Sequence, residues 1–511
     1  MTKRILTFLL AGFSAIALNA QTSTSGTKPV PLPDKSQQAP EQTQNQNNEM
    51  SRITIPPLPE FHPQMPKRLV LSNGMVVFLQ ENHELPVIGA TMRFRGGSTL
   101  EPAAKIGLTD IYGAVWRTGG TKQRTGDQLD DYLEARAAKI ETGASDDSTS
   151  IAFNCLKQDF NDVFAAYKEL LFQPEFRDDK VALIKHQIAG GISRRNDDVE
   201  EIAGREAGKL AYGPNSPYAR QAEYATIAAV TRQDLVDWHS KYANPTNAIF
   251  GVYGDFDPAQ MEKTIRDAFE KWPKGSKAPE PPAQISPAKP NVYFIPKEDV
   301  DQSSVQLVSL GIKRDNPDYF AVSVMNEVLS GGFASRLISN LRSKLGLAYS
   351  VGGGVGSDFD HVGMQDYAMS TKSSTTKDAI VGLKKELNDL ITQPPTPEEM
   401  KRAKDSILNS FVFNFDSKQK VLMEQMRYEF YGFPSNYLER YRAAIEKVTA
   451  ADVARVAKKY VHPEQLATLV VGNPGEIGDQ LTSLGQVQHI DITIPPPPGE
   501  SAASATPSAK K

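Results

Sequence analysis

Cysteine is almost absent from this chain, and Cys155 is the only one among 511 residues. A single thiol cannot close an internal disulfide, so the fold must be stabilised by packed apolar cores. Cys155 lies in the alternating, strand-like run 150–156. This setting favours a buried structural side chain over a reactive thiol.

Closely spaced histidines are absent as well. A catalytic zinc site built on one helix needs two His side chains about one turn apart on the same face. No two histidines of this chain are closer than twenty-one positions. The seven are His62, His83, His186, His239, His361, His462 and His489. The sequence therefore predicts no zinc or other cofactor in this chain.

The chain has no excess of positive charge and, after its first twenty residues, no long hydrophobic run. Its formal net charge is -4 and its sequence pI is near 6.1, whereas nucleic-acid-binding proteins usually carry a basic surplus. None of the later apolar stretches is long enough to span a bilayer. We therefore expect no nucleic-acid partner and no stable membrane insertion.

The first twenty residues are typical of an export signal. Lys3 and Arg4 are basic, residues 5–17 are apolar, and the small residue Ala20 precedes Gln21. The apolar run is too short to cross a membrane comfortably, and no cysteine near its end indicates a lipoprotein. The pattern predicts an exported protein, either periplasmic or secreted.

Length and composition indicate more than one domain. With 511 residues, 40% of them hydrophobic and 23% charged, the chain is long enough for two large cores. Segments rich in Gln, Asn, Ser and Pro indicate disorder or linkers. The predicted segments are an export signal (1–20), a disordered leader (21–58), an N-terminal domain (59–273), a Pro-rich linker (274–291), a C-terminal domain (292–488) and a disordered tail (489–511).

The two predicted domains end in similar sequences. Residues 230–254 and 448–472, which are 218 positions apart, share Val-Thr, Asp, Lys-Tyr and Pro at matching places, and an apolar strand follows in both. Agreement over some twenty-five positions indicates an internal repeat, which arises either from duplication or from a shared structural requirement.

Local signals predict strands followed by helices in each half. Polar turn residues separate alternating apolar runs, and Thr residues stand where helices begin. The predicted elements are a hairpin over Arg68–Gln80 turning at Ser72–Gly74, strands over Val87–Phe94 and Val305–Gly311, helices opening at Thr125 and Thr396, and a helix over Tyr319–Leu329. This order predicts an α+β fold in which each half is an antiparallel sheet with helices packed on one side.

Several short motifs occur in a fixed order along the folded region. They are Gly97-Ser98, Glu101-Pro102, Gly107-Leu108 and Thr118–Thr121 in the first half, and Leu341–Tyr349 in the second. In this order they resemble the M16 (pitrilysin/insulinase-like, mitochondrial-processing-peptidase-like) metallopeptidases over about residues 66–474. The resemblance implies two homologous α+β domains that form a half-clamshell.

In active members of that family, an inverted zinc motif, His-x-x-Glu-His, supplies two metal ligands and the base. The matching positions here are Asp110, Gly113 and Ala114, and the neighbourhood of the third ligand is that of Gly191. Glycine and alanine have no ligand atoms, and Asp110 alone would hold a metal weakly. The resemblance thus implies a degenerate motif that binds no metal, in a chain with negligible peptidase activity of its own.

The same family has an Arg and a Tyr, seven positions apart, that reach toward the zinc site of the other half or the other subunit. By this match they are Arg342 and Tyr349. Both side chains can donate hydrogen bonds to a peptide carbonyl and to the oxyanion that forms during hydrolysis. Without the resemblance, Arg342 would be a surface residue of an amphipathic helix and Tyr349 a packed strand aromatic.

A run of glycines, Gly352, Gly353 and Gly354, follows Tyr349 closely. It lacks the Lys-Ser/Thr ending of a phosphate-binding loop. Glycines here would let the backbone turn or would let a substrate strand approach closely. Because family members add an extended peptide to a sheet edge, the resemblance implies substrate binding at these glycines.

The sequence therefore favours the non-zinc, arginine/tyrosine-bearing subunit of a heteromeric M16 peptidase. A partner subunit carrying His-x-x-Glu-His would hold the zinc, and activity on a peptide substrate would need both chains. A second interpretation is a catalytically inactive peptide-binding or structural protein of the same fold. The retained Arg and Tyr favour the first interpretation.

Overall fold

The computed structural model describes residues 63–499 of the chain. The predicted export signal, the predicted leader and residues 500–511 of the predicted tail lie outside these residues. Among the helices of residues 63–499, none is long and apolar enough to cross a membrane.

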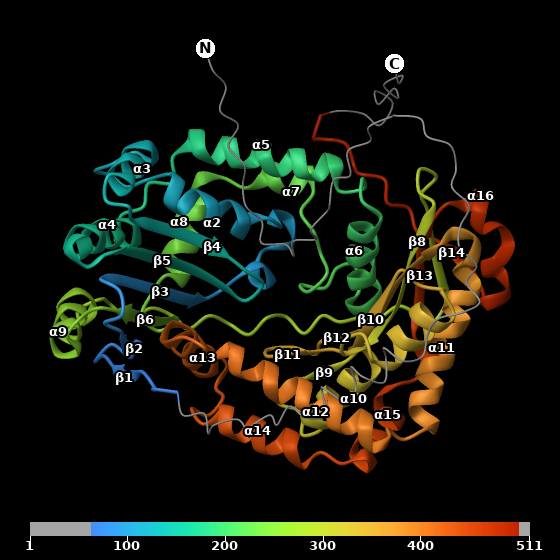
Figure 1. Ribbon diagram of the computed structural model, residues 1–511. Coiled ribbons are helices and arrows are strands. Elements are labelled where there is room, and N and C mark those ends of the chain that lie inside the picture. The colour runs from blue at the N-terminus through green and yellow to red at the C-terminus, as the bar shows by residue number, and fades with distance from the viewer. Residues whose placement is uncertain (1–62, 500–511) are drawn as a thin grey trace, which may run out of the picture. The chain divides into compact units, whose positions relative to one another are not determined.

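The first half opens with the predicted hairpin and then alternates strands with helices (Figure 1). Its elements are β1 (Lys67–Val70), β2 (Val76–Glu81), β3 (Val87–Arg95), α2 (Leu108–Thr118), α3 (Gly126–Glu134), β4 (Lys139–Ala144), β5 (Ser148–Leu156), α4 (Phe160–Phe172), α5 (Asp178–Arg194), α6 (Val199–Tyr212), α7 (Tyr224–Ala229), α8 (Arg232–Tyr242), β6 (Ala248–Gly254) and α9 (Pro258–Phe269).

The second half repeats this plan. Its elements are β7 (Val292–Pro296), β8 (Gln302–Leu310), β9 (Ile312–Lys313), α10 (Tyr319–Ser330), the π-helical segment η4 (Ile338–Lys344), β10 (Ser350–Val355), β11 (Ser357–Asp358), β12 (Met364–Lys372), α11 (Thr376–Thr392), α12 (Pro397–Phe411), α13 (Lys418–Tyr431), α14 (Tyr437–Lys447), α15 (Ala450–Tyr460), β13 (Ala467–Gly472), α16 (Pro474–Ile477) and β14 (Val487–His489).

Each half contains a six-stranded sheet, and five of the six strands follow the same order in both sheets. The edge strands β1 and β14 differ, because β1 opens its half and pairs antiparallel with β2, whereas β14 closes its half and pairs in parallel with β7. The first runs β1-β2-β6-β3-β5-β4, and the second runs β14-β7-β13-β8-β12-β10. The sheets are mixed rather than purely antiparallel as predicted, because β2 pairs in parallel with β6 and β7 with β13. In each of these pairs, one strand lies near the start of its half and the other near the end. The elements between them form a connection long enough for parallel pairing.

The local signals in the sequence are confirmed. The hairpin turns with Gly74 at a φ of 89°, a backbone conformation that favours glycine. The side chains of Thr125 and Thr396 cap α3 and α12 in reciprocal capping boxes. The repeat also holds locally, since Thr231 and Thr449 cap α8 and α15 in the same way.

Alternate residues of each sheet pack against helices of the same half. In β2, Val77 and Leu79 face a core formed with α2, α4, α8 and α9, and in β8, Val305 and Leu307 face the equivalent core. Cys155 is buried in the first core, and burial raises the pKa of its thiol to about 12. The prediction of a structural cysteine is therefore confirmed.

The opposite face of each sheet is covered by one helix from the other half. On the first sheet, Phe78 and Ile249 contact Leu422, Met426 and Phe430 of α13. A Cβ at Gly251 of β6 would lie 2.2 Å from the sulfur of Met426, so the absence of a side chain there allows α13 to approach. Helices thus cover both faces of this sheet, and the predicted one-sided packing is incomplete.

The second sheet is covered in the same way by α6. Ile202 and Ala203 of α6 pack against Ile295, Val308 and Leu469. Because α6 and α13 occupy equivalent places in the two repeats, the halves exchange equivalent helices. Each half therefore completes the core of the other.

Polar contacts support this exchange at the end of α13. The guanidinium of Arg93 lies 2.9 Å from a carboxylate oxygen of Asp147 and 3.0 Å from the hydroxyl of Tyr431. The Tyr431 hydroxyl in turn donates to Asp147. The Arg93 guanidinium also stacks 4.0 Å from the ring centroid of Phe430. One arginine of the first sheet thus fixes the last turn of α13.

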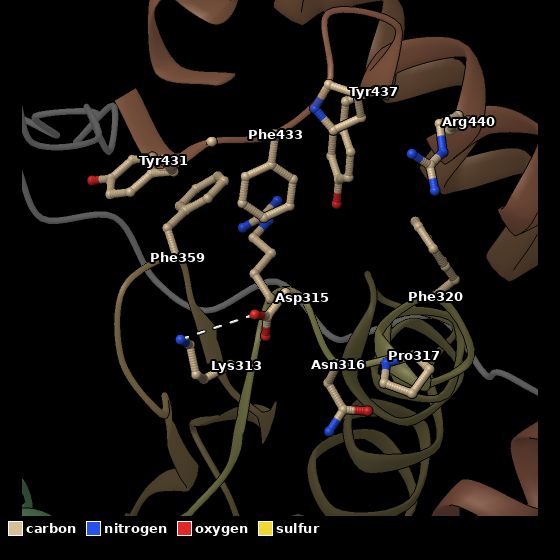
Figure 2. A pocket seen from close by; sticks show the side chains of 13 residues that line it. Lys313, Asp315, Asn316, Pro317, Phe320, Phe359, Tyr431, Phe433, Tyr437 and Arg440 are labelled. Carbon is tan, nitrogen blue, oxygen red and sulfur yellow. Dashed lines mark ion pairs between the residues drawn. The ribbon is translucent and has the colours of Figure 1, made fainter. Parts of the chain in front are cut away.

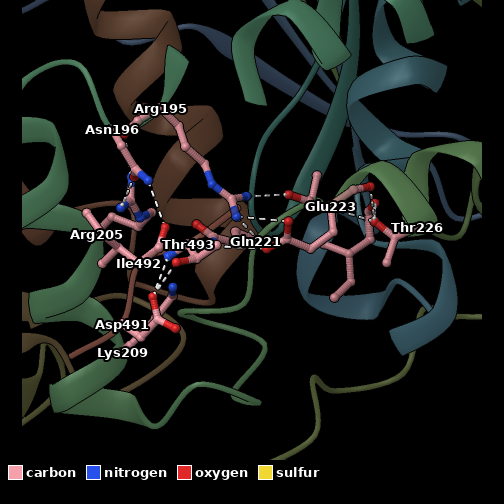
Figure 3. A network of polar contacts seen from close by, with 12 residues as sticks. Arg195, Asn196, Arg205, Lys209, Gln221, Glu223, Thr226, Asp491, Ile492 and Thr493 are labelled. Atoms are coloured by element: carbon pink, nitrogen blue, oxygen red, sulfur yellow. Dashed lines mark hydrogen bonds and ion pairs between the residues drawn. The ribbon is translucent and has the colours of Figure 1, made fainter. Parts of the chain in front are cut away.

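The predicted linker and the chain beyond the second sheet both pack against the first half. Residues 274–291 contain no helix or strand, and the amide of Ala288 donates to the carbonyl of Leu210 in α6 at 2.8 Å. After β14, the side-chain amide of Asn196 donates to the carbonyl of Ile492 at 2.7 Å (Figure 3). Ile494 then packs against the first core. Within the predicted disordered tail, Ile490, Ile492 and Ile494 thus have apolar partners.

Truncation of Phe430 tests the exchange of helices. Its side chain is 2% exposed, and we expect Phe430→Ala to lower the free energy of unfolding by about 3–5 kcal/mol. Met423 of the same helix is 37% exposed, and Met423→Ala should change stability by less than about 0.5 kcal/mol. Urea unfolding followed by tryptophan fluorescence reports on the first half, which contains all three tryptophans. Equal effects of the two substitutions would contradict the assigned packing.

Candidate functional site

Arg342 lies on η4, a short helix with wider turns than an α-helix. The amide of Leu345 donates to the carbonyl of Asn340, five residues earlier, at 3.0 Å. Segments of this kind are frequent at functional sites. The neighbouring Arg336 is held by Glu399 at 2.7 Å, whereas no carboxylate within residues 63–499 pairs with the exposed Arg342. The Arg342 guanidinium is therefore available to a ligand.

The structure brings Arg342 and Tyr349 together. The guanidinium carbon of Arg342 lies 5.8 Å from the ring centroid of Tyr349, within the range of a cation–π contact. Tyr349 directly precedes β10, its amide donates to the carbonyl of Ser370 at 2.9 Å, and its side chain is 74% exposed. The alternative interpretation of Tyr349 as a packed strand aromatic is therefore wrong.

Phe333 completes this cluster, and the sequence analysis did not single it out. Its ring centroid lies 5.6 Å from the guanidinium carbon of Arg342, and its side chain is 78% exposed. It follows the two glycines Gly331 and Gly332, an uncommon place for an aromatic residue in a loop. We call Phe333, Arg342 and Tyr349 the exposed cluster. It offers two hydrogen-bond donors and two aromatic surfaces.

The three candidate substrate-binding glycines lie on β10, at the end of the second sheet. No other strand of residues 63–499 pairs with the outer edge of β10. At Gly353, where φ is 126°, a Cβ would lie 2.1 Å from the carbonyl oxygen of Asp366, and at Gly354 it would meet the side chain of Asn326 at 2.5 Å. Gly352 faces open space. Packing thus requires two of the glycines, and Gly352 alone leaves room beside the strand.

The degenerate metal motif lies on α2, in the other half. Asp110 is exposed, and partial enclosure by protein atoms and the charge of Asp146 raise the pKa of its carboxyl. Gly113 is buried, and a Cβ there would lie 2.9 Å from the backbone nitrogen of Ala144 in β4. Ala114 is half-buried. The position matching the family's catalytic Glu therefore has no space for a side chain.

Thr142 of β4 secures this close packing. Its hydroxyl donates to the carbonyl of Gly113 at 2.6 Å and accepts from the amide of Arg117 at 3.2 Å. The hydroxyl thus bridges two backbone groups of α2 that lie one turn apart. Side chains inserted in this way locally distort a helix. At the position of the family's metal motif, α2 is thus packed against β4 and hydrogen-bonded to it.

The third position of the motif is also empty of ligand atoms. Gly191 lies on α5, and a Cβ there would meet nothing within 4 Å. Within residues 63–499, no group of three His, Cys, Asp or Glu side chains is placed to hold a metal ion.

Two family models match this chain. The one described as insulinase (peptidase family M16) matches residues 76–206, and the one described as the peptidase M16 inactive domain matches residues 229–407. Together they cover more than half of the chain. This chain belongs to the peptidase M16 family.

Relatives and solved structures agree with this membership. The "non-peptidase homolog YmxG" of Helicobacter pylori is 26% identical over 401 residues, covering 78% of this M16 chain and 91% of the relative. An "uncharacterized zinc protease" of Rickettsia bellii is 21% identical over 415 residues, covering 79% and 96%. Together with the missing ligands, these findings support an M16-fold homologue without peptidase activity of its own.

The fold itself is shared with crystal structures. A peptidase M16 inactive domain from Pseudomonas fluorescens superposes with a TM-score of 0.71 at 24% identity, over 80% of this M16 chain and 98% of that chain. A protease from Helicobacter pylori superposes with a TM-score of 0.68 at 20% identity, over 80% and 100%. The two-domain α+β architecture is therefore that of the M16 family.

Asp366 is a further residue that sequence reasoning missed. It lies on β12 opposite Gly354 of β10, and one of its carboxylate oxygens is buried without a hydrogen-bond partner. Burial raises the pKa of Asp366 to about 6. Only the pairing of β10 with β12 reveals that this carboxyl lies beside the glycine run.

Replacement of the two motif glycines should have opposite effects on stability. Gly113→Ala places a Cβ against the backbone of β4, so we expect a loss of about 1–3 kcal/mol in the free energy of unfolding. Gly191→Ala fills open space on a helix, so we expect a gain of roughly 0.5–1 kcal/mol. Chemical denaturation of the two variants measures both values. A neutral Gly113→Ala variant would show that α2 can be moved away from β4.

Asp366 should make stability depend on pH. Its folded-state pKa of about 6 exceeds the ordinary value of 3.8, so the folded protein binds this proton more tightly than the unfolded chain does. The contribution of Asp366 to the free energy of unfolding is therefore most favourable below pH 4 and is lost as the pH rises through about 6. Asp366→Asn should stabilise the protein at pH 8 by up to about 3 kcal/mol, with little effect at pH 4. Asp131→Asn, which removes an exposed carboxyl on α3, is the control substitution measured in parallel.

Proposed function

We propose that this chain is the non-zinc subunit of a heteromeric M16 peptidase. A partner subunit with an intact His-x-x-Glu-His motif would hold the zinc and activate the water. This chain would bind the peptide and donate hydrogen bonds to its reacting carbonyl. The observation that carries the proposal is the exposed cluster, in which Arg342 has no internal ion-pair partner.

The exposed cluster suits a role toward a bound peptide. The guanidinium of Arg342 and the phenol of Tyr349 can both donate hydrogen bonds. Neither group donates to an acceptor within residues 63–499. Donors placed in advance stabilise the oxyanion that develops when water attacks a carbonyl, because they need no reorganisation at that moment. Phe333 adds an apolar surface for a substrate side chain.

Part of the outer edge of β10 gives the peptide a backbone to pair with. Toward the end of the strand this edge is already bonded, because the Asn326 side chain bonds the amide and the carbonyl of Val355 at 3.0 Å and the Ser330 hydroxyl donates to the carbonyl of Gly353 at 2.6 Å. An extended peptide can add to an unpaired edge through main-chain hydrogen bonds, and β10 starts directly after Tyr349. The lack of a side chain at Gly352 leaves space at this edge. The added strand would therefore run past the two donors.

A peptidase assay with separated and mixed subunits tests the proposal. A quenched peptide library is incubated with this protein, with a candidate M16 partner that carries the zinc motif, and with both. Activity is expected only in the mixture. Arg342→Ala and Tyr349→Phe should each lower kcat by about 10²–10³-fold, because each removes one oxyanion donor.

Lys344→Ala is the matched control for loss of charge. Lys344 lies two positions from Arg342 on η4, is exposed, and contacts only Asn340 of its own helix, at 2.9 Å. This variant should retain full activity in the mixture. An inactive mixture of folded, zinc-loaded partners would favour the alternative, an inactive peptide-binding or structural protein of the M16 fold.

Export of the chain, which we infer from residues 3–20, would place this activity outside the cytoplasm.

A further inference from the structure

A cavity lies away from the exposed cluster, where α14 and the end of α13 meet the segment between β9 and α10 (Figure 2). Its volume is about 450 Å³, which is within the range of small-molecule sites. Five of the thirteen residues that line it are aromatic. The rings that line it belong to Phe320, Phe359, Tyr431, Phe433 and Tyr437.

Two arginines also line this aromatic cavity. The guanidinium carbon of Arg314 lies 4.5 Å from the ring centroid of Phe359, and its Nε is buried without a hydrogen-bond partner. The guanidinium of Arg440 lies on the side of Tyr437 and Phe320 (Figure 2). Within residues 63–499, neither arginine forms an ion pair with a carboxylate.

The carboxylates near these arginines interact with other cations. Asp315 at the rim pairs with Lys313 at 3.9 Å. Asp358 lies 3.6 Å from His361, and Glu424 pairs with Arg427 at 2.8 Å. Arg314 still interacts electrostatically with Asp358 and Glu424, since its charge acts to lower the pKa of both carboxyls. Neither carboxylate, however, lies within ion-pair distance of Arg314. Guanidinium groups bind carboxylates through paired N–H donors.

Tyr437 adds a third donor. Its hydroxyl is buried, and burial raises its pKa to about 12 even though the charges of Arg314 and Arg440 lower it. The phenol therefore keeps its proton at neutral pH and can donate a hydrogen bond to an anion. The arrangement combines apolar walls with donors for one negative group.

We propose that the aromatic cavity binds an aromatic carboxylate. Its ring would pack among Phe359, Phe433 and Phe320, and its carboxylate would accept hydrogen bonds from Arg314 and Arg440. A free aromatic acid and the C-terminal phenylalanine of a peptide share this chemistry. The site is independent of the proposed role of Arg342 and Tyr349.

Calorimetric titration of the full chain with 3-phenylpropionate tests this site. The neutral 3-phenylpropionamide has the same shape without the charge, and we expect it to bind at least about tenfold more weakly, which corresponds to 1.4 kcal/mol. Arg440→Gln should weaken phenylpropionate binding by a similar factor. Acetyl-Ala-Ala-Phe with a free or an amidated C-terminus then distinguishes the two sources, because a peptide-end site binds only the free form more tightly than phenylpropionate.

Arg442→Gln is the matched control on the same helix. Arg442 lies two positions from Arg440, does not line the cavity, and should leave binding unchanged. Thermal unfolding of both variants verifies that each is folded. Equal affinity for acid and amide, unchanged binding in Arg440→Gln, or no binding of phenylpropionate at millimolar concentration would each overturn the proposal.

Discussion

The exchange of α6 and α13 between the halves is the contact on which the rest of the structure depends. Each sheet buries one face with its own helices and the other with a helix from the opposite repeat. Burying one large apolar side chain contributes about 1.5–3 kcal/mol, so ten buried residues around α6 form a substantial second core. Neither half can lose its neighbour without exposing an apolar sheet face. We therefore expect the two repeats to unfold together. The shared cores also fix the position of η4, which carries Arg342, relative to α2, which carries Gly113.

The same close packing that stabilises the first half removes its metal site. An active M16 helix needs room for a Glu and two His side chains, yet here α2 lies against β4 and Thr142 bonds to its backbone at Gly113. Restoring the three motif residues alone would force α2 away from β4, and Gly191 on α5 would still provide no carboxylate. The space is closed at Gly113, whereas at Gly191 a Cβ would meet nothing within 4 Å. The chain thus keeps an M16 fold while its metal motif is degenerate.

Sequence reasoning succeeded where a feature is local. Thr125, Thr396 and the repeated Thr231 and Thr449 mark helix starts because a capping side chain bonds to its own next turn. It failed where a partner is distant in the sequence. The apolar face of α6 gives no indication that it covers the sheet of the other half, and Ile490 and Ile492 likewise pack against a cluster whose residues are distant in the sequence. The contact of Phe333 with Arg342 and the position of Asp366 opposite Gly354 depend on tertiary contacts that the sequence does not show.

Stability and ligand binding are assigned to separate residues in this chain. Phe333 and Tyr349 are more than 70% exposed, so the fold gains little from them, and no carboxylate of residues 63–499 pairs with Arg342. The neighbouring Arg336, by contrast, has a clear structural role through Glu399. A cation and two aromatic rings clustered on the surface expose apolar area to water, an arrangement that usually marks a binding site. Because these three side chains contribute little to the fold, their clustering near β10 agrees with the peptide binding that we propose.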